Sequence, residues 1–214
     1  MYYTLLLLAL LANFRPSSAE ANSLINKEYI QDVLTKDAAW ACTHQASGEY
    51  LGTGMLYYAL TYIKKAKLCV CLGSGGGFVP RIMRQAQRDL CLEDSTTILV
   101  DMDRALYGTS PTAFFRTEFP EIEIIIDTTH HVAVNQGKEW QVDYLHIDAD
   151  RSFQGAYQDV LDYLPLMAPK GIITFHDTHK SNPCARVIPL IREMGYDVVD
   201  FNTLGSGVAV IYLP

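Results

Sequence analysis

The stretch LCVCLGSGGGFVP, residues 68–80, joins a short apolar run directly to four glycines within five positions. An apolar run that ends at glycine predicts a buried parallel strand over Leu68–Leu72, followed by a tight loop. From Phe78 to Leu90 the apolar residues have helical spacing. Glycine permits positive φ and close approach of a ligand, and the start of the next helix offers backbone N–H groups. The stretch therefore predicts a strand–loop–helix unit with a ligand at its loop.

Two classes of ligand use such a unit. The dinucleotide pattern G-x-G-x-x-G requires a third glycine where this chain has Phe78, counting from Gly73, or Pro80, counting from Gly75. A nicotinamide-dependent oxidoreductase is therefore the disfavoured alternative. The G-x-G-x-G loop resembles motif I of the class I S-adenosylmethionine (SAM) methyltransferases, in which it wraps the amino-acid end of SAM. The resemblance implies cofactor-binding residues at Gly73, Ser74, Gly75 and Gly77. On this stretch alone, a structural turn in another α/β fold remains an alternative.

The composition is that of a globular α/β domain that does not bind nucleic acid. The 214 residues are 49% apolar and 19% charged, which suits one domain with a sizeable core. The net charge is −7, and no long basic run is present to neutralise phosphates. The five cysteines form no C-x-x-C pair, so a structural zinc motif is not supported. Cys69 and Cys71 alternate within the predicted strand and are expected to be small buried hydrophobes.

Strand and helix patterns alternate along the rest of the chain. After the first strand, the sequence predicts strands at Thr96–Val100, Ile122–Ile126, Val142–Ile147, Gly171–Phe175, Tyr196–Phe201 and Val208–Leu213. Helices are expected as one or two within Asn22–Ala46, and then at Met55–Ile63, from Ser110 to Pro120, at Phe153–Leu164 and at Cys184–Met194. Such alternation predicts a doubly wound, mainly parallel sheet. A turn at Gly205–Gly207 closes it with an antiparallel hairpin, and this order resembles the seven-stranded Rossmann-like methyltransferase fold more than a pure dinucleotide-binding domain.

An aspartate stands at the end of four of these strands: Asp101, Asp127, Asp148 and Asp177. Ligands of open α/β sheets bind beyond the carboxyl ends of the strands, so four acids on this rim favour a site over four separate helix caps. Asp101 is expected to accept hydrogen bonds from the ribose hydroxyls, with Asp103 as the neighbour that could share that role. Asp127 is placed to meet the adenine amino group or to cap the next helix.

The most specific resemblance lies in three blocks of the second half. These read HIDADRSFQG at residues 146–155, PKG at residues 169–171 and FHD at residues 175–177, with Asp159 between the first two. They resemble the methyltransferase family that includes macrolide-sugar O-methyltransferases and cephalosporin-hydroxylase-like proteins, whose pattern is close to IDGDHSYEGV, a later Asp, PGG and HD. The resemblance covers about Tyr50 to the C-terminus.

The resemblance implies a SAM-dependent fold, often with a divalent metal near the methyl acceptor. Carried over by position, Asp148 and His176 are the catalytic candidates, and Asp148, His176 and Asp177 are the metal-site candidates. Asp148 is also expected to contact the cofactor. Carboxylate ligands favour Mg²⁺, whereas including His176 would admit Mn²⁺ or a similar ion.

One departure from the family pattern is Arg151, which stands where the pattern has histidine. Arginine stays charged and cannot serve as a base, so either another group acts or catalysis is impaired. The second reading leaves a SAM-binding or partner-binding protein as an alternative. The fourth strand ends without the N/D-P-P-Y/F tetrapeptide of amino-group methylation, and the chain is acidic. Both points favour O-methylation of a small hydroxylated molecule, by a chain that could form a homo-oligomer.

The N-terminus has the shape of a signal peptide. Residues 5–12 are apolar, Arg15-Pro16 breaks the run, and Ala19-Glu20-Ala21 resembles a cleavage site. Against this, residues 1–4 carry no Lys or Arg, and the run is shorter than the roughly 20 residues that span a bilayer. Residues 1–21 are therefore either a signal peptide or an apolar helix. Residues 22–214 are expected to form one domain, with residues 22–54 as a helical cap on the acceptor side. Because SAM is made in the cytosol, the cytoplasm is narrowly favoured over the secretory pathway.

Overall fold

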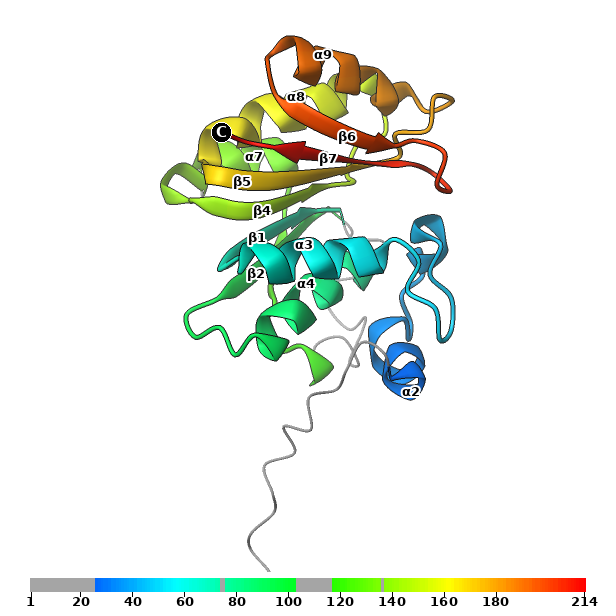
Figure 1. The fold of residues 1–214 in the computed structure, drawn as a ribbon. Helices are drawn as coiled ribbons and strands as arrows, with labels where there is room; N and C mark the ends of the chain where they lie inside the picture. Colours follow the sequence, from blue (N-terminus) through cyan, green and yellow to red (C-terminus); the bar gives the residue numbers. More distant parts are fainter. Residues whose placement is uncertain (1–25, 74–75, 103–116, 136) are drawn as a thin grey trace, which may run out of the picture.

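A seven-stranded sheet forms the middle layer of the computed structural model, which describes residues 26–73, 76–102, 117–135 and 137–214 (Figure 1). The strand order is β3-β2-β1-β4-β5-β7-β6. The strands are β1 (Leu68–Leu72), β2 (Thr96–Asp101), β3 (Glu123–Ile126), β4 (Val142–Ile147), β5 (Met167–His176), β6 (Asp197–Phe201) and β7 (Val208–Tyr212). Strands β1 to β5 pair in parallel, and β7 is antiparallel to both β5 and β6. The predicted doubly wound sheet with a terminal hairpin is confirmed.

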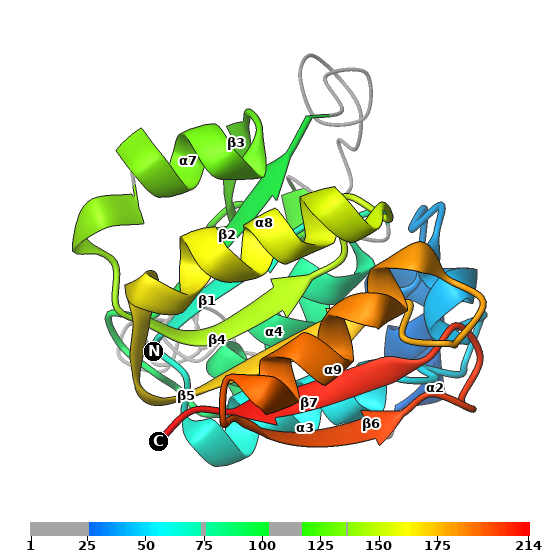
Figure 2. The same ribbon diagram turned by 90° about the horizontal axis from the view of Figure 1, so that it is seen from above.

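Helices cover both faces of the sheet (Figures 1 and 2). One face carries α3 (Gly54–Lys64) and α4 (Phe78–Asp89), and the other carries α7 (Thr129–Asn135), α8 (Phe153–Tyr163) and α9 (Val187–Glu193). Shorter helical turns are α2 (Lys27–Tyr29), η1 (Ile30–Leu34), η2 (Ala41–His44), η3 (Gly137–Glu139), η4 (Leu164–Leu166) and η5 (Pro183–Arg186). Among the described residues, no helix is both long and apolar enough to cross a membrane.

The residues of β1 alternate between two hydrophobic cores. Cys69 and Cys71 pack into the core that includes α4 residues, whereas Val70 and Leu72 pack into the core that includes α8 and α9 residues. All four side chains are fully buried. This alternation follows from the period of two of a strand that is covered on both faces. The prediction that both cysteines are small buried hydrophobes on one face is confirmed.

The N-terminal segment differs from a simple helix. It contains α2, the π-helical turn η1 and the 3₁₀ turn η2 in place of longer helices. The fully buried Arg81 of α4 donates hydrogen bonds to the carbonyls of Val33 and Lys36, which binds the end of η1 to α4. A side chain that satisfies terminal carbonyls stabilises the end of a helix.

One strand starts earlier than predicted, and two predicted segments lie wholly or mostly outside the described residues. Strand β5 begins at Met167 rather than Gly171, because Met167 pairs with Val142 across a register shift in the β4–β5 ladder. The helix predicted from Ser110 to Pro120 lies mostly in residues 103–116, outside the described residues, as does the predicted N-terminal segment, residues 1–21.

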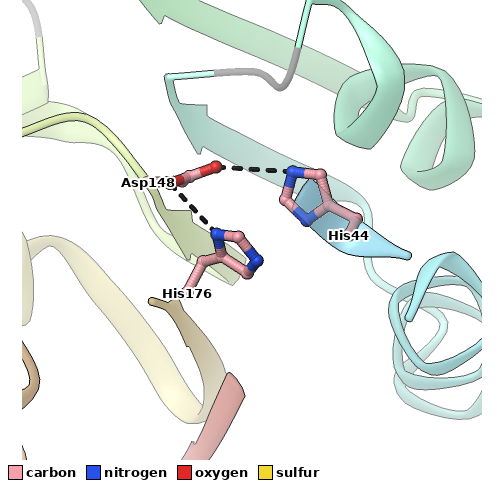
Figure 3. Close-up of side chains that lie close together, drawn as sticks. All are labelled: His44, Asp148 and His176. Carbon is pink, nitrogen blue, oxygen red and sulfur yellow. Dashed lines mark ion pairs between the residues drawn. The ribbon is translucent and has the colours of Figure 1, made fainter. Parts of the chain in front are cut away.

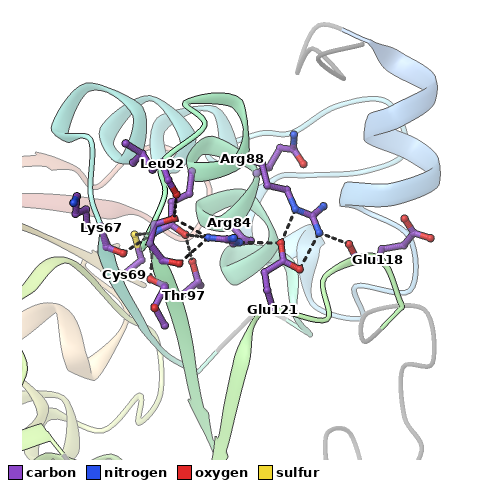
Figure 4. Close-up of polar contacts among 12 residues, drawn as sticks. Lys67, Cys69, Arg84, Arg88, Leu92, Thr97, Glu118 and Glu121 are labelled. Carbon is purple, nitrogen blue, oxygen red and sulfur yellow. Dashed lines mark hydrogen bonds and ion pairs between the residues drawn. The ribbon is translucent and has the colours of Figure 1, made fainter. Parts of the chain in front are cut away.

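An ion-pair network ties α4 to the chain before β3 (Figure 4). Glu121 Oε1 accepts from Arg84 Nε at 2.9 Å and from Arg88 Nε at 2.6 Å, and Oε2 accepts from Arg88 Nη2 at 3.0 Å. Partial burial alone would raise the pKa of Glu121, but the hydrogen bonds from Arg88 and Arg84 outweigh it and lower that pKa to about 2. The carboxylate therefore stabilises the fold wherever it is ionised.

Replacing Glu121 by glutamine should lower the free energy of unfolding by about 1 kcal/mol at pH 7, as expected for a partly exposed charge-assisted network. Because the folded pKa lies below the unfolded value, this stability is present above about pH 4.5 and is lost as the pH falls towards 2. Urea unfolding at pH 7 and at pH 3 should show a smaller difference between wild type and variant at pH 3. Glu93→Gln, on an exposed side chain, is the control, and an undiminished difference at pH 3 would contradict the assignment.

Candidate active site

A pocket of about 770 Å³ opens at the carboxyl ends of the parallel strands. Its wall includes Gly73 after β1, Asp101 at the end of β2, Asp127 after β3 and Asp148 after β4, together with Trp40 from the N-terminal segment. The ends of neighbouring parallel strands meet at one edge of the sheet, which is where open α/β sheets bind ligands. The structure thus brings three of the four predicted rim aspartates to one pocket.

The glycine loop is shaped by close backbone contacts. Gly73 has a φ of 70°, and a Cβ there would lie 2.1 Å from the carbonyl oxygen of Asp148. Gly76 has a φ of 71°, and a Cβ there would lie 2.5 Å from the backbone nitrogen of Ala39. Gly77, with a φ of 86°, precedes the first residue of α4. Only glycine fits the first two positions, because both the backbone conformation and the space exclude a side chain. The predicted Ser74 and Gly75 lie outside the described residues.

The two aspartates nearest the predicted nucleoside end have different surroundings. Asp101 ends β2 and lines the pocket. Asp127 also lines it, while its Oδ1 accepts from the backbone of Thr128 at 2.7 Å and its Oδ2 lies 2.5 Å from His131 Nδ1. The start of α7 is capped by the Thr128 hydroxyl, which accepts from the His131 backbone N–H at 3.1 Å. Asp103 lies outside the described residues.

A buried cluster of His44, Asp148 and His176 adjoins this pocket (Figure 3). The carboxylate of Asp148 contacts both imidazoles, with His44 Nε2 3.4 Å from Oδ2 and His176 Nδ1 3.3 Å from Oδ1, and the two rings lie against each other with centroids 4.1 Å apart. One nitrogen or oxygen atom from each residue lies within 4.8 Å of the others. The side chains are 0%, 4% and 2% exposed for His44, Asp148 and His176. Asp148 belongs to the cluster and to the pocket wall, so it connects the two.

Three parts of the chain build the cluster. Asp148 follows β4 directly, and His176 is the last residue of the adjacent strand β5. His44 ends η2, where its Nδ1 lies 3.1 Å from the hydroxyl of Tyr57 and its carbonyl accepts from the Thr53 backbone N–H at 2.9 Å. These contacts with α3 and its N-terminal flank turn Nε2 of the His44 ring towards Asp148.

Charge and burial act in opposite directions on the three groups. Burial alone would raise the pKa of Asp148, but the two histidines outweigh it and hold that pKa well below its usual range. Burial lowers the pKa of His44 despite the nearby carboxylate. Burial also acts to lower the pKa of His176, but the Asp148 carboxylate overcomes it and the net shift is upward. The cluster therefore holds an ionised carboxylate beside one imidazole that favours its neutral form.

Asp177 has a different partner from the one the sequence suggests. Its Oδ2 lies 2.7 Å from Nε of Arg151, while its Oδ1 is 3.7 Å from His176 Nδ1. Arg151 is 60% exposed and lines the pocket mouth. Asp177 is therefore next to the cluster without belonging to it, and its role as a metal ligand stays a prediction.

His44 is the site residue that the sequence analysis did not identify. It lies in a segment with no motif, and no spacing rule connects it to Asp148 or His176. His146 is also fully buried, and its Nδ1 lies 2.8 Å from the Thr174 hydroxyl inside the sheet. The ring of His146 packs beside that of His44, with centroids 5.9 Å apart, but His146 is not one of the three clustered residues.

Several solved structures with a similar fold are methyltransferases. An O-methyltransferase from Bacillus cereus in complex with SAH has a TM-score of 0.62 at 15% identity, with 88% of this chain and 96% of that chain covered. The O-methyltransferase TomG from Streptomyces achromogenes, in complex with SAM, has a TM-score of 0.63 at 13% identity, with 87% and 95% covered. The SAH-bound methyltransferase PaMTH1 from Podospora anserina has a TM-score of 0.62 at 16% identity, with 86% and 88% covered.

At such low identity these structures establish the fold alone. No curated protein matches the chain significantly by sequence. The family model described as "Methyltransferase domain" matches residues 70–178, which run from β1 through the glycine loop and Asp148 to just beyond Asp177. That match covers just over half of the chain, so the protein belongs to this methyltransferase-domain family and has the class I methyltransferase fold.

Proposed function

We propose that this protein is a SAM-dependent O-methyltransferase that acts on a small hydroxylated molecule. The observation that carries the proposal is a single pocket whose wall contains the glycine loop, the strand-end Asp101 and the buried Asp148. Its volume of about 770 Å³ is within the range of small-molecule sites. The SAM and S-adenosylhomocysteine bound to similar structures support the ligand class, and the family match supports the reaction class.

Successive parts of the pocket wall match the methionine, ribose and adenine parts of SAM. The methionine end would lie at Gly73 and Gly76, where the absence of side chains lets a ligand approach the backbone. The carboxylate of Asp101 can accept from both ribose hydroxyls, since it has two oxygens and several lone pairs. The adenine ring would lie towards Asp127 and Thr128, at the end of β3. This arrangement directs the sulfonium methyl towards Asp148.

Methyl transfer is an in-line displacement at the methyl carbon. The acceptor oxygen forms a bond to that carbon while the carbon–sulfur bond breaks, which leaves S-adenosylhomocysteine. Positioning the two reactants is the main contribution of the protein. The acceptor also loses a proton, and His176 is the buried imidazole on this rim that can accept it, with the ionised Asp148 carboxylate 3.3 Å away to stabilise the protonated ring. A divalent cation held by Asp148 and His176 would lower the pKa of the acceptor hydroxyl.

One alternative has an observation in its favour. Arg151 takes the place of the family's histidine and pairs with Asp177, so a titratable group is missing from the pocket mouth. A chain that binds SAM without turning it over would fit that departure. The buried Asp148–His176 pair favours the enzyme, since it keeps two groups capable of holding a proton beside the pocket.

Binding of S-adenosylhomocysteine tests the cofactor assignment. Isothermal titration calorimetry should show one site per chain, and Asp101→Ala should weaken binding about 10- to 100-fold, because it removes hydrogen bonds to a charged acceptor. Asp197→Ala is the matched control, since Asp197 begins β6 at the opposite end of the sheet. Tight binding of NAD with no binding of S-adenosylhomocysteine would overturn the proposal.

Turnover separates the enzyme from the SAM-binding alternative. Purified protein should transfer the SAM methyl group to at least one acceptor in a panel of catechols, sugars and polyketides. Asp148→Asn should lower that turnover by about 100-fold or more, because the amide no longer stabilises a proton on the base His176, while S-adenosylhomocysteine still binds. Mass spectrometry of the products and Asp197→Asn as a control complete the assay. S-adenosylhomocysteine binding without methylation of any acceptor would support the alternative.

A further inference from the structure

We propose that His44, Asp148 and His176 form a binding site for a divalent transition-metal cation, with His44 as a ligand supplied by the N-terminal segment. The inference refines the proposed function, because Asp148 also lines the SAM pocket. It does not depend on methyl transfer, since cation binding can be measured by itself.

The spacing of the three side chains is that of ligands around one small ion. Metal–ligand bonds of about 2.0–2.1 Å place neighbouring ligand atoms about 3.3 Å apart at tetrahedral angles. His44 Nε2 lies 3.4 Å from Asp148 Oδ2 and His176 Nδ1 lies 3.3 Å from Asp148 Oδ1, so each imidazole stands near that distance from one oxygen of the shared carboxylate. They exceed the roughly 2.7–2.9 Å of charge-assisted hydrogen bonds. The contacts are therefore longer than strong charge-assisted hydrogen bonds, and one nitrogen or oxygen atom from each of the three residues lies within 4.8 Å of the others.

The facing atoms have no hydrogen-bond partner among the described residues. His44 Nε2, Asp148 Oδ1 and His176 Nδ1 are all fully enclosed and all unsatisfied. Buried polar atoms are nearly always paired, and one nitrogen or oxygen atom from each residue lies within 4.8 Å of the others, so one bound cation can reach all three side chains. A cation satisfies all three, because each atom carries a lone pair when the histidines are neutral.

Tyr57 and Thr53 hold the His44 ring in the orientation that a metal ligand needs. Its other ring nitrogen, Nδ1, lies 3.1 Å from the Tyr57 hydroxyl, and Thr53 holds its carbonyl. Metal-binding histidines commonly engage an oxygen through the second ring nitrogen, which fixes the ring orientation. Tyr57 is fully buried, so this contact is rigid rather than a surface encounter.

The ligand set determines the class of cation. Two imidazole nitrogens and one carboxylate oxygen suit Mn²⁺, Fe²⁺ or Zn²⁺ better than Mg²⁺, which prefers oxygen ligands. Asp177, which would supply an additional oxygen, is instead held by Arg151 at 2.7 Å. Arg151 thus engages an Asp177 oxygen that could otherwise bind the cation, and His44 supplies a nitrogen ligand in its place.

Cation binding to the chelator-treated full chain tests the site directly. Calorimetry with Mn²⁺, Zn²⁺ and Mg²⁺ should show one site per chain, with Mn²⁺ and Zn²⁺ bound at least tenfold more tightly than Mg²⁺. His44→Gln should weaken Mn²⁺ binding about 100-fold. Tyr57→Phe should weaken it about tenfold, because the hydroxyl that orients the His44 ring is lost. At a hundredfold excess over Kd, Mn²⁺ should raise the Tm of wild type by about 5–10 °C and leave His44→Gln nearly unchanged.

His146→Gln is the matched control, because His146 is equally buried but lies outside the cluster, and it should bind Mn²⁺ like wild type. Wild-type affinity in His44→Gln, equal affinity for Mg²⁺ and Mn²⁺, or no saturable site would each overturn the inference. Circular dichroism and the Tm of the metal-free protein verify that each variant is folded. If His44→Gln fails that check, unchanged Mn²⁺ affinity in Tyr57→Phe refutes the site and a tenfold loss supports it. Loss of S-adenosylhomocysteine binding in wild type would count against the proposed function alone.

Discussion

The contact between Gly73 and the end of β4 is the constraint on which the site depends. Strands β1 and β4 are parallel neighbours, and the backbone after β1 passes so close to Asp148 that a Cβ at residue 73 would lie 2.1 Å from the Asp148 carbonyl oxygen. The ligand loop and the buried carboxylate are therefore held at a fixed separation by the sheet itself. A ligand bound at the glycine loop therefore also lies beside Asp148 in the same pocket.

The N-terminal segment completes what the sheet begins. Ala39 packs on Gly76, Trp40 lines the pocket, and His44 reaches the buried Asp148. Arg81 holds this segment from the other side through the carbonyls of Val33 and Lys36. The N-terminal segment, which contributes Trp40 to the pocket wall, is thus attached to α4, the helix that follows the glycine loop. A displacement of α4 would therefore move both the glycine loop and the segment that carries His44.

The sheet and its rim could be predicted because both follow from local patterns. A period of two in β1, the glycines after Leu72 and the aspartates at the ends of the other four parallel strands can be recognised from local sequence alone. Parallel pairing then brings Asp101 and Asp148 to one edge. The early start of β5 at Met167 was not readable, since it depends on a register shift opposite Val142.

His44 and the partner of Arg151 were out of reach for a different reason. His44 meets Asp148 only through the packing of a segment that has no periodic pattern, so its proximity is a tertiary property. Arg151 was recognised as a departure from the family pattern, but its 2.7 Å contact with Asp177 depends on how the loop after β4 packs against the end of β5. The sequence could identify which residue was unusual, and the structure identifies which residue it engages.

A crystal structure of the protein with S-adenosylhomocysteine is the most direct test of the central claim that the glycine loop directs the methyl group to Asp148. The ribose hydroxyls should contact Asp101, the amino-acid end should lie on Gly73–Gly77, and the sulfur should face the Asp148 side of the pocket. A ligand bound in the reverse direction, with adenine on the glycine loop, or bound outside this pocket, would contradict that claim.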